Sequence, residues 1–214
     1  MVAALYVRAP GCYTNLPGVD PWPETRDARR YVGPWSVVAH PPCQRWGRLW
    51  RTDGSTTPGQ DAGCFAAALA AVRRWGGVLE HPSASKAWPA HCLPRPDPAQ
   101  QWTAPDAFGG RSIHVEQGHY GHRARKATWL YAVSRSTLPA LARGKSAARA
   151  YLMQPGRCSR TKPRATCPCV RCETLHGADW RGQHNRGVPR LTARENEQTP
   201  IPFRDVLLRI AMLA

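Results

Sequence analysis

The stretch QDAGCFAAALAAVRRWGGVLEHP, residues 60–82, decides the fold. Alanine dominates residues 60–75, and because alanine has the highest intrinsic helix propensity, this part predicts a helix. Gly76 and Gly77 follow at the place where glycine commonly ends a helix. The compact apolar run VLEHP then predicts a buried strand. A helix that stops at a Gly-Gly step and returns at once to a strand is typical of an α/β fold.

The segment before this stretch completes a strand-helix-strand unit. WSVVAH, residues 35–40, predicts another buried strand, so the unit from Ser36 to Pro82 predicts two parallel strands joined by a right-handed crossover. Functional groups in such sheets collect where strands end and loops begin. Cys43 and Glu80 both stand at predicted strand ends. We therefore expect an α/β, Rossmann-like fold with these two side chains near its functional edge.

The remaining elements follow from the same patterns. Residues 8–34 are rich in Gly and Pro and predict mostly loop, and residues 88–105 predict a proline-rich surface loop. Three further strands and a final amphipathic helix are predicted at VAALYV (2–7), RSIHVEQ (111–117), ATWLYAV (127–133) and FRDVLLRIAMLA (203–214). We divide the chain into an α/β core (1–133), a basic cysteine-rich insert (134–187) and a segment that returns to the core (188–214).

The charge of the chain points to a polyanionic partner. Thirty Lys and Arg residues face 14 Asp and Glu residues, which gives a net charge of +16 and a pI near 10.3. A biased genome can explain why arginine outnumbers lysine, but it does not explain the excess of positive charge. Nucleic acid, and double-stranded DNA in particular, is the expected partner.

The sequence predicts a soluble, cytoplasmic protein. No apolar run approaches the roughly 18 residues that a membrane helix needs, and the amino terminus lacks the pattern of a signal peptide. We expect the eight cysteines to be thiols or metal ligands and not disulfides.

Four short motifs occur in one order along the chain: HPPCQ (40–44), GGVLEHP (76–82), YGHRARKATWLY (120–131) and RLTARE (190–195). This order resembles the cytosine-5 DNA methyltransferase family. That family has a Pro-Cys-Gln loop, a Glu-Asn-Val strand end, a Tyr-Gly segment with spaced arginines and an Arg-x-Leu-Thr-x-Arg-Glu segment. The resemblance covers roughly residues 19–203 and implies a small, divergent, phage-type member with a trimmed amino-terminal half of the methyltransferase fold.

The resemblance implies covalent chemistry on a flipped cytosine. Cys43 would add as a thiolate to carbon 6, and Glu80 would protonate ring nitrogen 3, so that carbon 5 becomes able to attack a one-carbon electrophile. The base must leave the duplex because carbon 6 is not reachable inside the stack. The alternatives are a buried structural cysteine and an ordinary surface carboxylate.

The basic segment after the Tyr-Gly step aligns in two ways. If the alignment starts from the Tyr-Gly step, Lys126 and Thr128 match the family's two arginines. If positive charges are aligned instead, Arg123 and Arg125 match them. We predict that Arg125 or Lys126 orients the cytosine, with a solvated basic face as the alternative. The resemblance also implies that Arg190 and Thr192 organise the junction with the insert, and His81 replaces the family's asparagine. Further expected DNA contacts are Gln44, Arg45 and Arg123.

The one-carbon donor stays open. The family's Phe-x-Gly-x-Gly turn, which cradles S-adenosylmethionine, has no counterpart before Cys43. Asp20 and Asp27 are the candidates for contacts to the cofactor. The chain would bind S-adenosylmethionine in a reduced pocket, use a folate donor such as methylenetetrahydrofolate and leave a hydroxymethyl group, or depend on a second copy or an accessory subunit to complete the site.

The insert carries a separate cysteine cluster. Cys158, Cys167, Cys169 and Cys172 suit a structural zinc ion, which would stabilise a subdomain too small for its own core. The alternative is a flexible basic loop with incidental thiols. The surrounding cations predicted to contact phosphates or guanine are Arg160, Lys162, Arg164 and Arg171.

Two other functions compete with DNA modification. A non-catalytic DNA-binding protein could be built on a decayed methyltransferase scaffold, although such a protein has no need of both the thiol and the carboxylate at strand ends. The charge alone would also permit a modifier of RNA.

Overall fold

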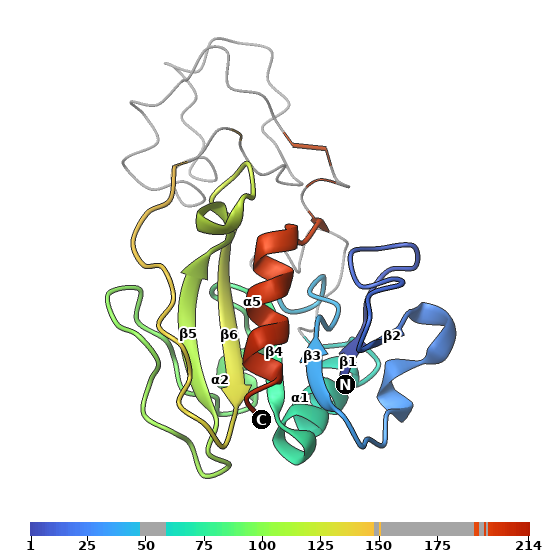
Figure 1. Ribbon diagram of the computed structural model, residues 1–214. Helices are drawn as coiled ribbons and strands as arrows, with labels where there is room; N and C mark the ends of the chain where they lie inside the picture. The colour runs from blue at the N-terminus through green and yellow to red at the C-terminus, as the bar shows by residue number, and fades with distance from the viewer. Residues whose placement is uncertain (48–58, 148–149, 151–190, 193–194, 196) are drawn as a thin grey trace.

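The computed structural model describes residues 1–47, 59–147, 150, 191–192, 195 and 197–214. These residues form a six-stranded sheet in the order β2-β1-β3-β4-β6-β5 (Figure 1). The strands are β1 (Val2–Leu5), β2 (Val19–Trp22), β3 (Ser36–Ala39), β4 (Gly77–Pro82), β5 (Arg111–Glu116) and β6 (Ala127–Val133).

The first half of the sheet is parallel and the second half is antiparallel. Strand β1 pairs in parallel with β2 on one side and β3 on the other, and β3 pairs in parallel with β4. Strand β6 lies antiparallel between β4 and β5. The predicted parallel pairing of β3 and β4 is confirmed. The mixed α/β architecture is compatible with a Rossmann-like fold, in which chain order runs outward in both directions from the middle of a parallel sheet.

Two helices cover opposite faces of this sheet, so that the core has two layers. Helix α1 (Cys64–Trp75) packs on the face formed by Leu5, Val37 and Leu79. Helix α5 (Ile201–Ala211) packs on the other face, against Val38 and Val78 and their neighbours. Residues of one strand point alternately to the two faces because side chains alternate along a strand. Both helices confirm their predictions, and Figure 1 shows them on either side of the sheet.

The prediction of mostly loop for residues 8–34 is wrong for β2. Its sequence, Val-Asp-Pro-Trp, has no apolar alternation, and Pro21 cannot donate a backbone hydrogen bond. Proline is tolerated because β2 is an edge strand that pairs only with β1. The rest of this segment includes two short 3₁₀ turns, Glu24–Arg26 and Ala28–Arg30. Tertiary pairing, and not local propensity, makes this strand.

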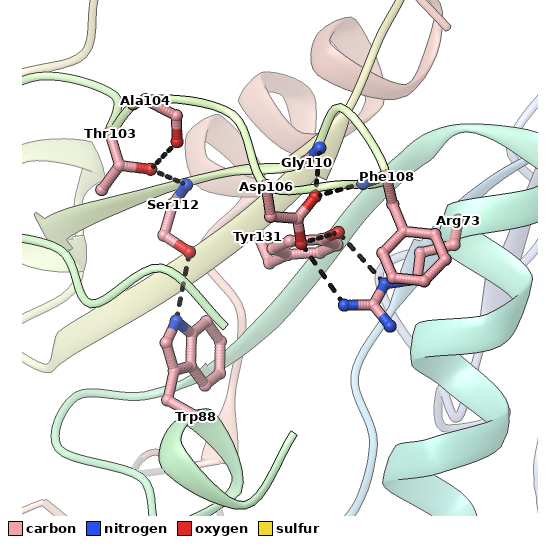
Figure 2. Close-up of polar contacts among 9 residues, drawn as sticks. All are labelled: Arg73, Trp88, Thr103, Ala104, Asp106, Phe108, Gly110, Ser112 and Tyr131. Atoms are coloured by element: carbon pink, nitrogen blue, oxygen red, sulfur yellow. Dashed lines mark hydrogen bonds and ion pairs between the residues drawn. The ribbon is translucent and has the colours of Figure 1, made fainter. Parts of the chain in front are cut away.

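A polar network holds the loop before β5 against α1 and β6 (Figure 2). The Tyr131 hydroxyl donates to Asp106 at 2.8 Å and accepts from the Arg73 guanidinium at 3.2 Å, while Arg73 and Asp106 form an ion pair at 3.3 Å. The other Asp106 oxygen accepts the backbone amides of Phe108 and Gly110. This network lies just beyond the predicted surface loop of residues 88–105, whose first residues form part of a short helix, α2 (Ala87–Ala90).

The described start of the predicted insert is held against the core. The Trp102 indole donates to the Pro139 carbonyl at 2.8 Å, and the backbone amide of Leu141 donates to Gln101. Further along, Glu116 accepts both the amide and the hydroxyl of Ser146. In the part of the chain that the structure describes, no helix is long and apolar enough to cross a membrane.

Replacing Gly77 by alanine is expected to destabilise the fold strongly. Gly77 has a φ of +116°, and an added Cβ would lie 2.0 Å from the backbone oxygen of Val37 on the paired strand. Strain from the backbone and from overpacking together predict a loss of about 3 kcal/mol in the free energy of unfolding. Gly63→Ala is the matched control, because Gly63 also has a positive φ but has open space around it, and it should cost only about 1 kcal/mol. Urea unfolding of both variants measures the difference, and equal losses would contradict the close packing of β3 on β4.

Candidate active site

The candidate site lies at the carboxyl ends of the parallel strands. Chain order changes direction between β1 and β3, since β2 lies on the far side of β1 and β4 on the far side of β3. In open α/β sheets, ligands bind at the carboxyl edge beside such a switch point. In this chain the edge carries His40 to Cys43 after β3 and Glu80 near the end of β4. The predicted meeting of Cys43 and Glu80 at one edge of the sheet is therefore what the structure shows.

Cys43 lies at the start of a tight turn. Its carbonyl oxygen accepts the backbone amides of Trp46 at 3.0 Å and Gly47 at 2.8 Å. The Trp46 indole is buried and donates to Asp61, whose carboxylate also accepts the amide of Phe65 at the start of α1. The thiol therefore lies on a backbone that is anchored to the first turn of α1. Of its neighbours in the motif, Gln44 is exposed and Arg45 is partly exposed.

Glu80 is a largely buried carboxylate with a donor on each oxygen. Its side chain is 14 % exposed, and one oxygen lies 3.0 Å from His40 Nδ1. The other oxygen accepts from the Gln117 amide at 3.3 Å. Burial on its own would raise the pKa of Glu80, but the hydrogen bond and charge of His40, together with the charge of Lys126, outweigh it and lower the pKa. At neutral pH Glu80 is therefore ionised.

His40 also contacts a buried phenol. Its Nε2 lies 2.9 Å from the Tyr13 hydroxyl, and the Tyr13 side chain is 2 % exposed. Burial, followed by the negative charges of Cys12 and Glu80, raises the pKa of Tyr13 well above its usual value. The phenol is therefore neutral at physiological pH. Tyr13, His40 and Glu80 form a continuous hydrogen-bonded chain that joins the loop after β1 to β3 and β4.

Gln117 ties Glu80 to the neighbouring strand. Its side-chain amide donates to the Thr128 hydroxyl at 3.0 Å as well as to Glu80, and Thr128 in turn donates to the Lys126 carbonyl. The Gln117 carbonyl oxygen is buried and has no hydrogen-bond partner within the described residues. The sequence patterns did not indicate Gln117 or Tyr13 as site residues, and they included His40 only as the first residue of the HPPCQ motif. No local pattern marks Gln117 or Tyr13, because the chain folds them into the site from distant segments.

The structure separates the two cations predicted to orient the base. Burial is the largest influence on the Lys126 ammonium and lowers its pKa. The negative charges of Glu80 and Cys43 partly oppose that shift. It donates to the Gln198 carbonyl at 2.9 Å. Lys126 also has a φ of +42°, an uncommon conformation for a side-chain-bearing residue that is enriched at functional sites. Arg125 donates instead to the Ser146 carbonyl. Lys126 is therefore the cation in the candidate site.

Residues from the last predicted motif lie across the edge of this site. Thr192 and Glu195 form reciprocal hydrogen bonds of the kind that cap a helix, and Glu195 also pairs with Arg123 at 2.7 Å. Glu197 pairs with Arg8 after β1. The junction role expected for Thr192 stays a prediction, because most of the insert that it would join, and Arg190, lie outside the described residues. The ion pair of Arg123, a residue predicted to contact DNA, is partly exposed.

The surroundings of the Cys43 thiol disfavour its thiolate form. Burial is the largest cause that raises its pKa, and the negative charge of Glu80 raises it further, while Lys126 lowers it. At neutral pH only a small fraction of Cys43 is therefore a thiolate, and Lys126 is the cation that opposes Glu80. A thiolate would need added positive charge or the loss of negative charge nearby.

His81 is a core residue and not a member of the site. Its ring stacks on Trp88 at a centroid distance of 6.4 Å and meets Phe65 edge-on. Ser85 bonds its Nδ1 at 2.8 Å. Burial lowers the pKa of His81 to about 4, so the ring is neutral at physiological pH. The Pro42 carbonyl lies close enough to oppose this shift, although no hydrogen bond of good geometry joins it to Nε2.

The two aspartates predicted to bind a cofactor both have arginine partners. Asp20 lies within β2 and accepts from the Trp22 indole and from Arg26, whereas Asp27 pairs with Arg29 at 2.7 Å. A surface depression beside Asp27 is lined by Trp22, Thr25, Arg26, Asp27 and Arg30. Neither aspartate has both oxygens free, so a cofactor ribose would compete with these pairs.

The remaining predicted site residues lie outside the described part of the chain. They are the cysteines 158, 167, 169 and 172 and the basic residues Arg160, Lys162, Arg164 and Arg171. Among the residues that are described, no group of three or more His, Cys, Asp or Glu side chains could hold a metal ion. No protein family model matches the chain, and no curated protein or solved structure matches it either.

Charge-removing substitutions are expected to change the reactivity of Cys43 in opposite directions. Glu80→Gln removes the negative charge that raises the thiol pKa, so alkylation by iodoacetamide at pH 8 should become several-fold faster. Lys126→Gln removes the opposing positive charge, so alkylation should become slower. Peptide mass spectrometry follows Cys43, and exposed Cys92 in the same digest is the reference thiol. Equal rates in the two variants would show that the three groups do not interact.

Proposed function

We propose that the protein modifies cytosine at carbon 5 in DNA through a covalent adduct with Cys43. The observation that carries this proposal is the convergence of Cys43, Glu80 and Lys126, which come from three separate segments, at the carboxyl edge of the parallel sheet. A nucleophile, a carboxyl group and a cation beside one another are the parts that addition to a pyrimidine requires. The net charge of +16 supports a DNA partner.

The proposed reaction begins with addition to the ring. The Cys43 thiolate forms a bond to carbon 6, and a proton passes from the Glu80 carboxyl group to ring nitrogen 3, which leaves an enamine. Carbon 5 then attacks the one-carbon donor and displaces its leaving group. A water molecule takes the proton from carbon 5 as the thiolate departs, which restores the aromatic ring, and nitrogen 3 returns its proton to Glu80. The base must be flipped out of the duplex for the thiol to reach carbon 6.

Lys126 is the residue that we propose to orient the base. Its ammonium group is near both reacting side chains and is held at Gln198, so it can favour the thiolate and contact the pyrimidine oxygen. Arg125 faces Ser146 and is proposed to support the loop toward the insert. The cations Arg45 and Arg123 are proposed to contact phosphates, as are the basic residues of the insert.

Methyl transfer from S-adenosylmethionine is the proposed default, and hydroxymethyl transfer from a folate donor is the alternative. Cys43 and Glu80 act on the base and not on the donor, so the base chemistry is common to both. Asp20 and Asp27 are already paired with arginines, so neither carboxylate indicates which donor binds. The mass of the product therefore distinguishes the two donors better than the residues at the carboxyl edge of the sheet do.

DNA from cells that express the protein is expected to contain a modified cytosine. Nucleoside mass spectrometry should detect a deoxycytidine heavier by one methylene for a methyl donor, or by the mass of formaldehyde for a folate donor. Cys43→Ala should abolish the product, and Glu80→Gln should lower it by about 10² or more because general acid catalysis is lost. Cys92→Ala is the control and should retain full activity. Unmodified DNA from wild-type cells would favour the non-catalytic DNA-binding alternative.

The cysteine cluster of the insert stays a prediction from sequence. We expect the purified protein to contain zinc, measured by atomic absorption, and Cys169→Ser to lose it because a tetrahedral site needs all four ligands. Cys92→Ser is the matched control and should keep the metal. A wild-type protein without zinc would favour the incidental-thiol alternative.

A further inference from the structure

The Tyr13–His40–Glu80 chain contains a titratable group that the proposed reaction does not yet use. Addition to the cytosine requires a proton at Glu80, yet the structure holds Glu80 as a carboxylate that accepts from His40 and Gln117. Gln117 cannot supply a proton because an amide does not titrate. Among the described residues that hydrogen-bond to Glu80, His40 is the one that can carry a proton and release it.

Tyr13 is suited to a histidine that changes its protonation state. When His40 is neutral, the Tyr13 hydroxyl can donate to Nε2 while Nδ1–H donates to Glu80. When His40 is an imidazolium, Nε2–H donates and the same hydroxyl accepts. An acceptor-only or donor-only partner at 2.9 Å would satisfy only one of these states. The buried phenol therefore keeps the chain hydrogen-bonded in both.

We propose that His40 is a positioning residue that stores the proton which Glu80 delivers to the base, with Tyr13 as its partner. This inference rests on the proposed function. Proton transfer from Nδ1 of the imidazolium to the Glu80 carboxylate yields a neutral imidazole and a carboxylic acid. The acid protonates ring nitrogen 3 as the thiolate adds, and when the thiolate departs the proton returns to Glu80 and then to His40. No proton is consumed by this relay over a full cycle.

Other charged and titratable groups surround the relay and contribute to its pH dependence. Lys126 and His81 act on Glu80, and Arg204 and Asp205 on α5 act on Tyr13. Cys43 and Glu197 act on Lys126. Substitutions at His40 and Tyr13 leave all these groups in place. Among the described residues, the charged and titratable groups that act on the relay or on Lys126 and Cys43 beside it are Cys12, Cys43, His81, Lys126, Glu197, Arg204 and Asp205.

The test uses the exchange of the hydrogen at carbon 5, which needs no donor. Addition of Cys43 and protonation of nitrogen 3 make carbon 5 basic, so it takes a proton from water and loses its original hydrogen before the thiolate departs. Duplex DNA of mixed sequence, tritiated at carbon 5 of cytosine, therefore releases tritium to water. The rate is measured from pH 5 to 9 for the full-length wild type, Cys43→Ala, His40→Gln and Tyr13→Phe.

His40→Gln is expected to lose activity increasingly as the pH rises. Glutamine can still donate to Glu80 but cannot store a proton, so the carboxyl group must hold it alone. Loss of the His40 charge lets the pKa of Glu80 rise, but general acid catalysis still fails once the carboxyl group ionises. The loss should therefore grow from nearly none at acidic pH to roughly 100-fold at neutral pH. Tyr13→Phe should show a smaller loss with the same trend, roughly tenfold. The double variant should be no worse than His40→Gln, since the two residues act in one chain.

Controls separate the relay from the chemistry on which it rests. His114→Gln, a partly buried histidine bonded to Trp129 on β5 and β6, should leave the profile unchanged. A loss in His40→Gln and Tyr13→Phe that is the same factor at every pH would mean a purely structural role and would overturn the relay alone. If the wild type releases no more tritium than Cys43→Ala at any pH, the proposed function fails and the relay with it. If His40→Gln does not fold, the pH dependence of the loss in Tyr13→Phe tests the relay in its place.

Discussion

The hydrogen bond between His40 and Glu80 is the interaction on which the candidate site depends. A carboxylate that is 14 % exposed at the end of a central strand is costly unless donors compensate for its lost hydration. His40 supplies one donor from β3, and Gln117 supplies the other from the turn after β5. Because the donors come from elements on both sides of β4, the carboxylate fixes how these elements meet at the carboxyl edge.

The charge of Glu80 also affects Cys43, the proposed nucleophile. The same negative charge that satisfies His40 also raises the pKa of Cys43, so the thiol stays protonated while Glu80 is ionised. Transfer of one proton from the Cys43 thiol to the His40–Glu80 pair would change both protonation states together. The thiol would become the thiolate, and Glu80 would become the carboxylic acid, as the proposed reaction requires. Lys126 favours the first change, since its positive charge lowers the pKa of the thiol.

The sequence predicted the elements that depend on local patterns. Helix α1 follows from its alanines and its Gly-Gly stop, and Cys43 and Glu80 were placed correctly because strand ends are visible in the sequence. Strand β2 was missed because an edge strand with a proline is made by its partner. Tyr13 and Gln117 were missed for a related reason, since their hydrogen-bond partners lie 27 and 37 positions away. Side chains that gain their role from long-range packing leave no local signal.

The two hydrogen bonds of Glu80 also determine what a cytosine base would have to replace under the proposed function. Both oxygens of Glu80 are occupied, so a pyrimidine that reaches it has to displace one donor or share an oxygen with it. The bond from Gln117 is the longer of the two, at 3.3 Å against 3.0 Å, and Gln117 keeps a second acceptor in Thr128. Releasing Gln117 therefore costs less than releasing His40, whose Nδ1 has Glu80 as its partner. In the proposed reaction, we expect the base to take the place of Gln117 and the bond between His40 and Glu80 to persist.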